Sequence, residues 1–187
     1  RARDVFGDDT ELRYAADDLP SWVDFAVDCA GHTALHQHGA AILASGIDLL
    51  TVSSGALADD ELRDQLIAAG ADGGSQLFVV SGAIGALDVL AAAGVGGLES
   101  VTYRGRKPPQ GWVGSPAEDK LDLDALSEAT VHFSGSARDA ALQYPKNANV
   151  AASVALAVRP VSWTRPVRLV LARQMFFTGV DASSLVL

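Results

Sequence analysis

The strongest constraint on the fold is a pattern that occurs three times between residues 22 and 94. Short apolar runs at residues 22–30 (WVDFAVDCA), 47–55 (IDLLTVSSG) and 75–82 (SQLFVVSG) are typical of strands, and each precedes a stretch whose apolar residues have helical spacing. Strands and helices that alternate through short connections favour a parallel sheet with right-handed crossovers. The sequence therefore predicts an α/β fold for this part of the chain.

The three predicted strands end in similar clusters of small residues. The clusters are CAGH at residues 29–32, SSGA at 53–56 and SGAIG at 81–85. Ligands of parallel sheets bind beyond the carboxyl ends of the strands, where small residues let an extended ligand approach the backbone and helix N-termini. One such cluster is explained by the glycine that a tight turn needs. Three of them along one sheet edge favour a ligand-binding rim.

A second, less regular unit follows Gly97. Residues 98–112 (LESVTYRGRKPPQGW) predict a strand that ends in a basic loop, and residues 115–129 predict a loop and a short helix. Residues 130–158 predict a strand, a helix, a loop and another helix. We therefore expect a smaller mixed α/β unit after the parallel sheet.

Composition and charge exclude several classes of partner. The chain has 187 residues, with 14 Lys and Arg against 23 Asp and Glu, and its net charge of -9 repels both nucleic acid and an anionic membrane surface. No apolar run approaches the roughly 18 residues that span a bilayer. The single cysteine, Cys29, has no partner for an internal disulfide, so we expect a cytoplasmic protein with no nucleic-acid or membrane partner.

Five motifs, in order and at these separations, resemble the L-aspartate dehydrogenase family. They are DCAGH, GIDLLTVSSGALAD, SGAIGALD, VTYRGRKPP and SGSARDAALQYPKNANVAASVALA, and the resemblance covers about residues 24–157. It implies NAD(P)-dependent oxidation of L-aspartate to iminoaspartate, a first step towards quinolinate and NAD. It also implies a homo-oligomer with a partial Rossmann-type dinucleotide-binding domain at residues 1–96. Residues 97–187 would form an α/β catalytic and oligomerisation domain.

The resemblance also assigns two cofactor-binding residues, Ala83 in SGAIG and Asn149 in YPKNANVAA. Asn149 would lie at a helix N-terminus and face the nicotinamide end of NAD or NADP, with an amide that can donate and accept. The alternative for Asn147 or Asn149 is an N-cap, a common role of asparagine.

Two family features are missing from the sequence. The glycine-rich turn for the pyrophosphate does not precede the first predicted strand, and residues 150–187 contain no histidine to act as the base. We therefore assign no catalytic residue, expect divergence or truncation after about residue 158, and expect weak or no turnover from this chain by itself. The alternative function is a catalytically dead nucleotide-binding or assembly module with the same fold.

The remaining candidates are basic residues and histidines. Four basic residues lie in the motifs of the second unit: Arg104, Arg106, Lys107 and Lys146. One interpretation is that they bind carboxylate or phosphate groups, and the other is that they form a solvated surface.

His32 either lines the cofactor pocket or has a capping or surface role, while His132 is predicted to be structural. His32 and His36 share a helix face but lack further ligands in sequence, so we predict no metal. Cys29 is predicted to be a small buried apolar residue.

Overall fold

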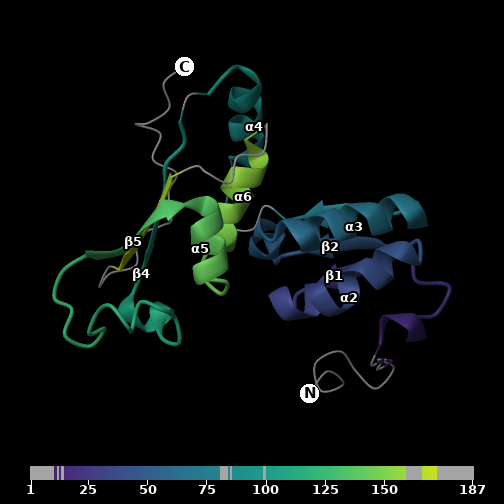
Figure 1. Ribbon diagram of the computed structural model, residues 1–187, viewed down its shortest axis with the longest axis horizontal. Coiled ribbons are helices and arrows are strands. Elements are labelled where there is room, and N and C mark those ends of the chain that lie inside the picture. Colours follow the sequence, from purple (N-terminus) through teal and green to yellow (C-terminus); the bar gives the residue numbers. More distant parts are fainter. Residues whose placement is uncertain are drawn as a thin grey trace.

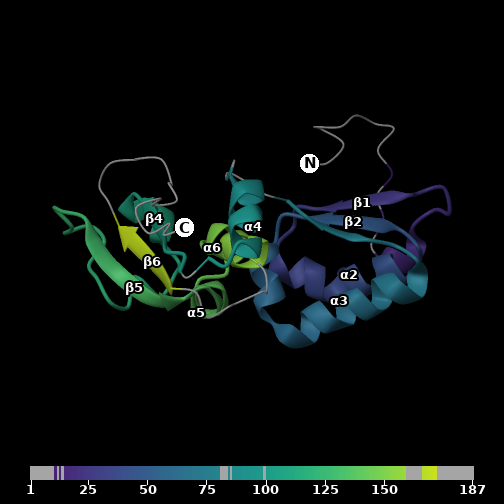
Figure 2. The same cartoon turned by 90° about the horizontal axis from the view of Figure 1, so that it is seen from above.

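Two three-stranded sheets lie at opposite ends of the molecule, with helices between them (Figures 1 and 2). The computed structural model describes residues 11, 13, 15–80, 84, 86–98, 100–158 and 166–171. A short 3-10 helix, η1 (Ala16–Asp18), precedes the first sheet. None of the helices formed by these residues is both long and apolar enough to cross a bilayer.

The first sheet is parallel, as the strand and helix alternation predicts. Its strands β1 (Phe25–Asp28), β2 (Asp48–Thr51) and β3 (Leu77–Val79) lie in the order β1-β2-β3. Helices α2 (His32–Ala44) and α3 (Asp60–Gly73) pack side by side on one face of this sheet (Figure 2). The predicted α/β class and the partial Rossmann-type sheet are confirmed.

The core between α2 and α3 follows from helical spacing. Leu35 and Leu43, two turns apart on α2, and Leu66 on α3 are at most 1% exposed. Each buried leucine contributes roughly 2 kcal/mol relative to an exposed one. A Cβ at Gly39 would lie 2.8 Å from Leu66 Cδ2, so this glycine lets the two helices approach closely.

Helix α3 continues past Gly70 as far as Gly73. It begins with a side-chain cap, because Asp59 accepts hydrogen bonds from the amides of Glu61 and Leu62 at 3.0 and 3.4 Å. It ends at Gly74, whose φ of 68° is the left-handed conformation that favours glycine. Gly70 is instead a buried residue of the last turns.

The second sheet is mixed. Strand β6 (Pro166–Leu171) lies between β4 (Tyr103–Lys107) and β5 (Thr130–Ser136), parallel to β4 and antiparallel to β5. The pairing of β5 with β6 is irregular between Val131 and Phe133. The mixed α/β unit after the parallel sheet is therefore present.

Three helices lie between the sheets: α4 (Leu87–Val95), α5 (Ala137–Gln143) and α6 (Asn149–Ala157) (Figure 1). Helix α6 packs against the 3-10 helix η2 (Ser54–Ala58), which follows β2. Ala151, Ala152 and Ala155 on α6 are at most 1% exposed, and their small side chains allow this close contact. One hydrophobic core thus runs from α2 to α6.

The short helix predicted within residues 115–129 does not form. This segment makes turns after the 3-10 helix η3 (Pro109–Trp112). The Asp122 side chain accepts hydrogen bonds from the amides of Asp124 and Ala125 at 3.1 and 3.3 Å, which is the local bonding by which aspartate favours turns over helix.

Candidate functional site

The candidate site lies where the carboxyl ends of β1 and β2 meet the start of α6. Gly31, with a φ of 99°, connects the end of β1 to α2, and Ser53 and the five residues of η2 continue from β2 as a buried segment. Helix α6 reaches this rim from the second unit. Two of the three predicted rims are therefore brought together.

Asn149 joins the two units through its side chain. Its Oδ1 accepts hydrogen bonds from the backbone amide of Gly55 at 3.0 Å and from His32 Nε2 at 3.1 Å. A carboxamide oxygen has two lone pairs, and both are directed to donors here. The oxygen is therefore occupied by groups of the chain itself, and the amide nitrogen remains as a donor for a ligand.

The N-cap interpretation of the two asparagines is also wrong. Ala148 holds the N-cap position of α6 without a side-chain hydrogen bond, and Asn149 is the first helical residue. Asn147 Oδ1 accepts a hydrogen bond from Lys107 Nζ at 2.6 Å. Both asparagine side chains are thus directed to other segments of the chain and not to their own helix terminus.

Serine hydroxyls fix the backbone of the same contact. Ser54 Oγ donates to the Asn149 carbonyl at 2.8 Å, and Ser153 Oγ donates to Ser54 Oγ at 3.0 Å. A Cβ at Gly55 would lie 2.8 Å from Asn149 Oδ1 and 2.9 Å from His32 Cε1. The glycine of SSGA is therefore required by the close approach of two side chains, which is a stronger reason than a tight turn.

Ala83, the other predicted cofactor-binding residue, lies outside the described residues. Its distance from Asn149 remains a prediction.

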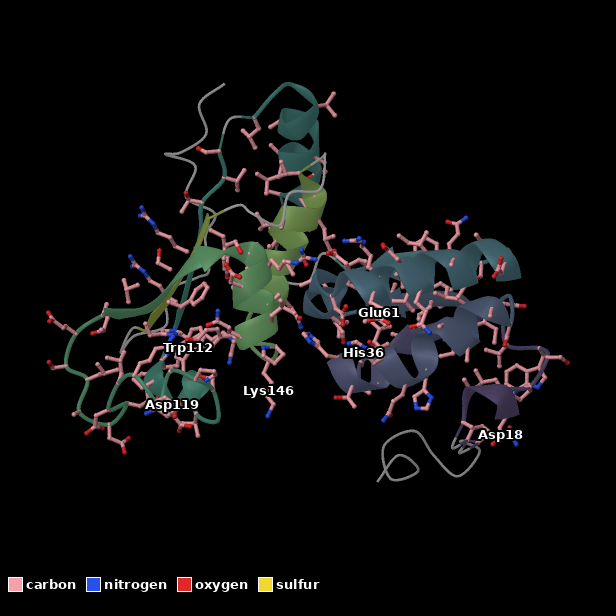
Figure 3. All side chains as sticks on the ribbon, viewed as in Figure 1. Asp18, His36, Glu61, Trp112, Asp119 and Lys146 are labelled. Atoms are coloured by element: carbon pink, nitrogen blue, oxygen red, sulfur yellow. The ribbon has the colours of Figure 1, made fainter. Side chains whose placement is uncertain are left out.

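Lys107 is half-buried at the end of β4, whereas Arg106 is exposed. Lys146 is exposed as well, and its side chain points away from the ribbon in Figure 3. Besides its bond to Asn147, its Nζ lies 5.3 Å from the centroid of the Trp112 ring. Burial lowers the pKa of Lys107. The interpretation as a solvated surface therefore holds for Arg106 and Lys146 but is wrong for Lys107, which anchors the turn that leads to Asn149.

An aromatic cluster packs next to Lys107, through the ring of Trp112. The rings of Trp112 and Tyr144 are fully buried, and His132 packs against both, with its ring centroid 4.3 Å from that of Trp112. Burial, with the nearby charge of Lys120 as a smaller cause, lowers the pKa of His132 to about 4. A neutral, packed imidazole agrees with the structural role predicted for it.

Cys29 and His36 differ from the site residues. Cys29 is exposed, so its prediction as a buried apolar residue is wrong. Strand β1 ends one residue earlier, at Asp28, so Cys29 is not part of the sheet. The exposed His36 Nε2 lies 3.9 Å from Oδ2 of Asp59, the N-cap residue of α3, and Figure 3 shows His36 on α2. Within the described part of the chain, no three His, Cys, Asp or Glu side chains are grouped as metal ligands.

A parallel sheet with a rim of small residues, contacted by a second, mixed α/β unit, defines the class of two-unit α/β proteins with a partial Rossmann-type sheet. Comparisons with known families narrow this class. Residues 6–80 match the family model described as homoserine dehydrogenase, NAD binding domain, and residues 88–177 match the model described as aspartate dehydrogenase, C-terminal. Together the two models cover both units.

Whole proteins that are similar to this chain are named L-aspartate dehydrogenase. The chain is 56% identical over 151 residues to an L-aspartate dehydrogenase of Ruegeria pomeroyi, which covers 81% of this chain and 55% of that protein. It is 58% identical over 134 residues to one of Ralstonia nicotianae, covering 72% of this chain and 50% of the relative. The chain belongs to the L-aspartate dehydrogenase family and spans about half the length of the curated relatives it matches.

A solved structure agrees with this assignment. The crystal structure of aspartate dehydrogenase from Thermotoga maritima superposes with a TM-score of 0.65 at 28% identity. The superposition covers 88% of this chain and 63% of that protein.

Sequence reasoning missed the side chains that hold Asn149. His32 is 117 residues away in sequence, and the pairing of Lys107 with Asn147 spans 40 residues. Gly55 in the SSGA cluster after β2 is a local signal of such a contact, because glycine allows another group to approach the backbone closely.

Proposed function

We propose that the chain acts as an NAD(P)-dependent L-aspartate dehydrogenase, which oxidises L-aspartate to iminoaspartate. The observation that carries this proposal is the amide of Asn149, held against the rim of the first sheet by Gly55 and His32. An amide donor beside a rim of small residues fits the carboxamide and hydroxyl oxygens of a nicotinamide nucleoside. When bound, NAD or NADP supplies the hydride acceptor for the Cα–H bond of the amino acid.

Each unit has its own part in this proposal. Residues 1–96 form the dinucleotide-binding domain, in which Ala83 joins Asn149 as a cofactor contact. Residues 97–187 form the catalytic and oligomerisation domain of a cytoplasmic homo-oligomer. The turn held by Lys107 and Asn147 directly precedes α6, which packs on η2, and this supports a position for the turn near the proposed cofactor. The base that accepts a proton from the substrate stays unassigned.

Two measurements on the purified chain test the proposal. Isothermal titration with NAD and with NADP measures cofactor binding, and Asn149→Leu is expected to raise the Kd about tenfold, since it removes hydrogen bonds worth about 1 kcal/mol or more. Aspartate-dependent reduction of the cofactor, followed by absorbance, measures the activity. Turnover by this chain is expected to be weak, so even slow aspartate-dependent reduction supports the dehydrogenase, whereas cofactor binding with no measurable reduction favours the nucleotide-binding module. Unchanged binding by Asn149→Leu would remove Asn149 from the site.

A further inference from the structure

The two hydrogen bonds to Asn149 determine which of its atoms is oxygen. A backbone amide can only donate, so the atom 3.0 Å from the Gly55 nitrogen is Oδ1 and not Nδ2. The same oxygen lies 3.1 Å from His32 Nε2, so His32 carries a proton on Nε2 in this contact. Geometry therefore sets the orientation of the amide and requires a proton on Nε2 of His32.

The alternative orientation of Asn149 is strongly disfavoured. A half-turn of the carboxamide would direct the Nδ2 hydrogens at the Gly55 amide and at the His32 N–H, so that donors would face donors. Such a turn would lose the hydrogen bond from the Gly55 amide in a part-buried place, and the contact with His32 would stay a hydrogen bond only if the imidazole proton moved to Nδ1. In the described structure no acceptor takes a hydrogen bond from Nδ2. The amide nitrogen is thus the group that remains available to a ligand.

We propose that His32 is a positioning residue, which with Gly55 locks Asn149 so that its Nδ2 donors face the bound dinucleotide. The inference rests on the proposed function, in which Asn149 contacts the cofactor. The ligand atom at this position must then be a hydrogen-bond acceptor, such as a carboxamide or ribose hydroxyl oxygen. His32 suits this role because it is half-buried at the first position of α2, directly after the rim glycine Gly31.

A purely structural contact between the two units makes a different prediction. If His32 served only to fill space beside Asn149, a side chain of similar volume without a donor would replace it. A positioning role requires an N–H donor at the same place. His32→Gln keeps an N–H donor and His32→Leu removes it, so this pair separates the two roles. His36→Leu, on the exposed side of the same helix, is the matched control.

The first measurement needs no ligand. Nitrogen-15 NMR of the full chain should show His32 protonated on Nε2 at neutral pH, and the side-chain amide resonances of Asn149 should shift in His32→Leu but not in His36→Leu. His32→Gln should restore resonances close to those of the wild type. Two results would overturn the positioning role: protonation of His32 on Nδ1 and not on Nε2, or Asn149 side-chain amide shifts that are the same in His32→Leu as in the wild type.

The second measurement is calorimetric titration with NAD and NADP. We expect His32→Leu to raise the Kd about tenfold and His32→Gln to stay within about threefold of the wild type, with His36→Leu unchanged. Equal affinity for His32→Leu and wild type would overturn the proposal. A wild-type chain that binds no dinucleotide would refute the proposed function instead, whereas the NMR measurement still decides whether His32 orients Asn149.

Discussion

Acidification from pH 6.5 to 4 should destabilise the fold through one buried histidine. Burial first, and then the charge of Lys120, lowers the pKa of His132 from its usual 6.5 to about 4. In the unfolded chain this histidine takes up a proton near pH 6.5, whereas in the folded chain it stays neutral until about pH 4. The unfolded state therefore binds more protons in this window, and the free energy of unfolding falls as the pH falls.

The difference between the two pKa values sets the magnitude. The difference between the pKa values of the unfolded and folded states corresponds to about 3 kcal/mol in the free energy of unfolding. This is a large share of a typical domain stability of roughly 5–15 kcal/mol. The contribution is complete above pH 6.5 and is lost progressively down to pH 4. The groups around the imidazole do not offset its charge, because Tyr144 Oη lies 3.3 Å from Nδ1 and Lys120 is itself a cation.

The assay is urea denaturation at several pH values between 7 and 4, for the wild type and for His132→Phe. Phenylalanine keeps a ring against Trp112, and Tyr144 Oη keeps its bond from Lys120 Nζ at 3.0 Å. The variant should lose most of the pH dependence in this window, while His36→Gln should keep it. Equal slopes in wild type and His132→Phe, or a His132 pKa near 6.5 by NMR titration, would refute the reasoning.

Two further substitutions test the packing of the site and a helix cap. Gly55→Ala should lower the free energy of unfolding by about 1–3 kcal/mol, because the new Cβ would lie 2.8 Å from Asn149 Oδ1. Denaturant unfolding measures this loss, and an alanine variant as stable as the wild type would show that the contact is loose. Ser136→Ala should cost about 1 kcal/mol, since Ser136 and Asp139 form a capping box at the start of α5. Thermal unfolding measures it, with exposed Ser134→Ala on β5 as the control that should stay unchanged.

The helices were the most predictable part of the fold. The periodicity of Leu35 and Leu43 correctly gave the buried face of α2, because a helix buries a stripe set by its own sequence. Strand lengths were less predictable, since β3 has three paired residues within a longer apolar run. Pairing with β2 sets those limits, and this information lies elsewhere in the chain. Helical spacing alone does not set the width of the buried stripe, since Ile67 is 60% exposed next to the buried Leu62 and Leu66 on α3.

Parts of the site could not be read from local sequence. The family motif gave Asn149, but its partners Gly55 and His32 belong to two separate rims that only the tertiary fold brings together. Strand β6 is a similar case, since its partner strands end well before it begins in the sequence. Non-local pairing of this kind leaves little trace in local propensity.

The central place of β6 has a consequence for synthesis of the protein on the ribosome. The strands β4 and β5 emerge first, but neither pairs with the other, because β6 separates them in the finished sheet. Until residue 171 has left the exit tunnel, the nascent chain carries two open strand edges with unpaired amides and carbonyls. The second sheet is therefore completed late in synthesis. A pause in translation before β6 emerges would leave β4 and β5 free to pair with strands of neighbouring chains.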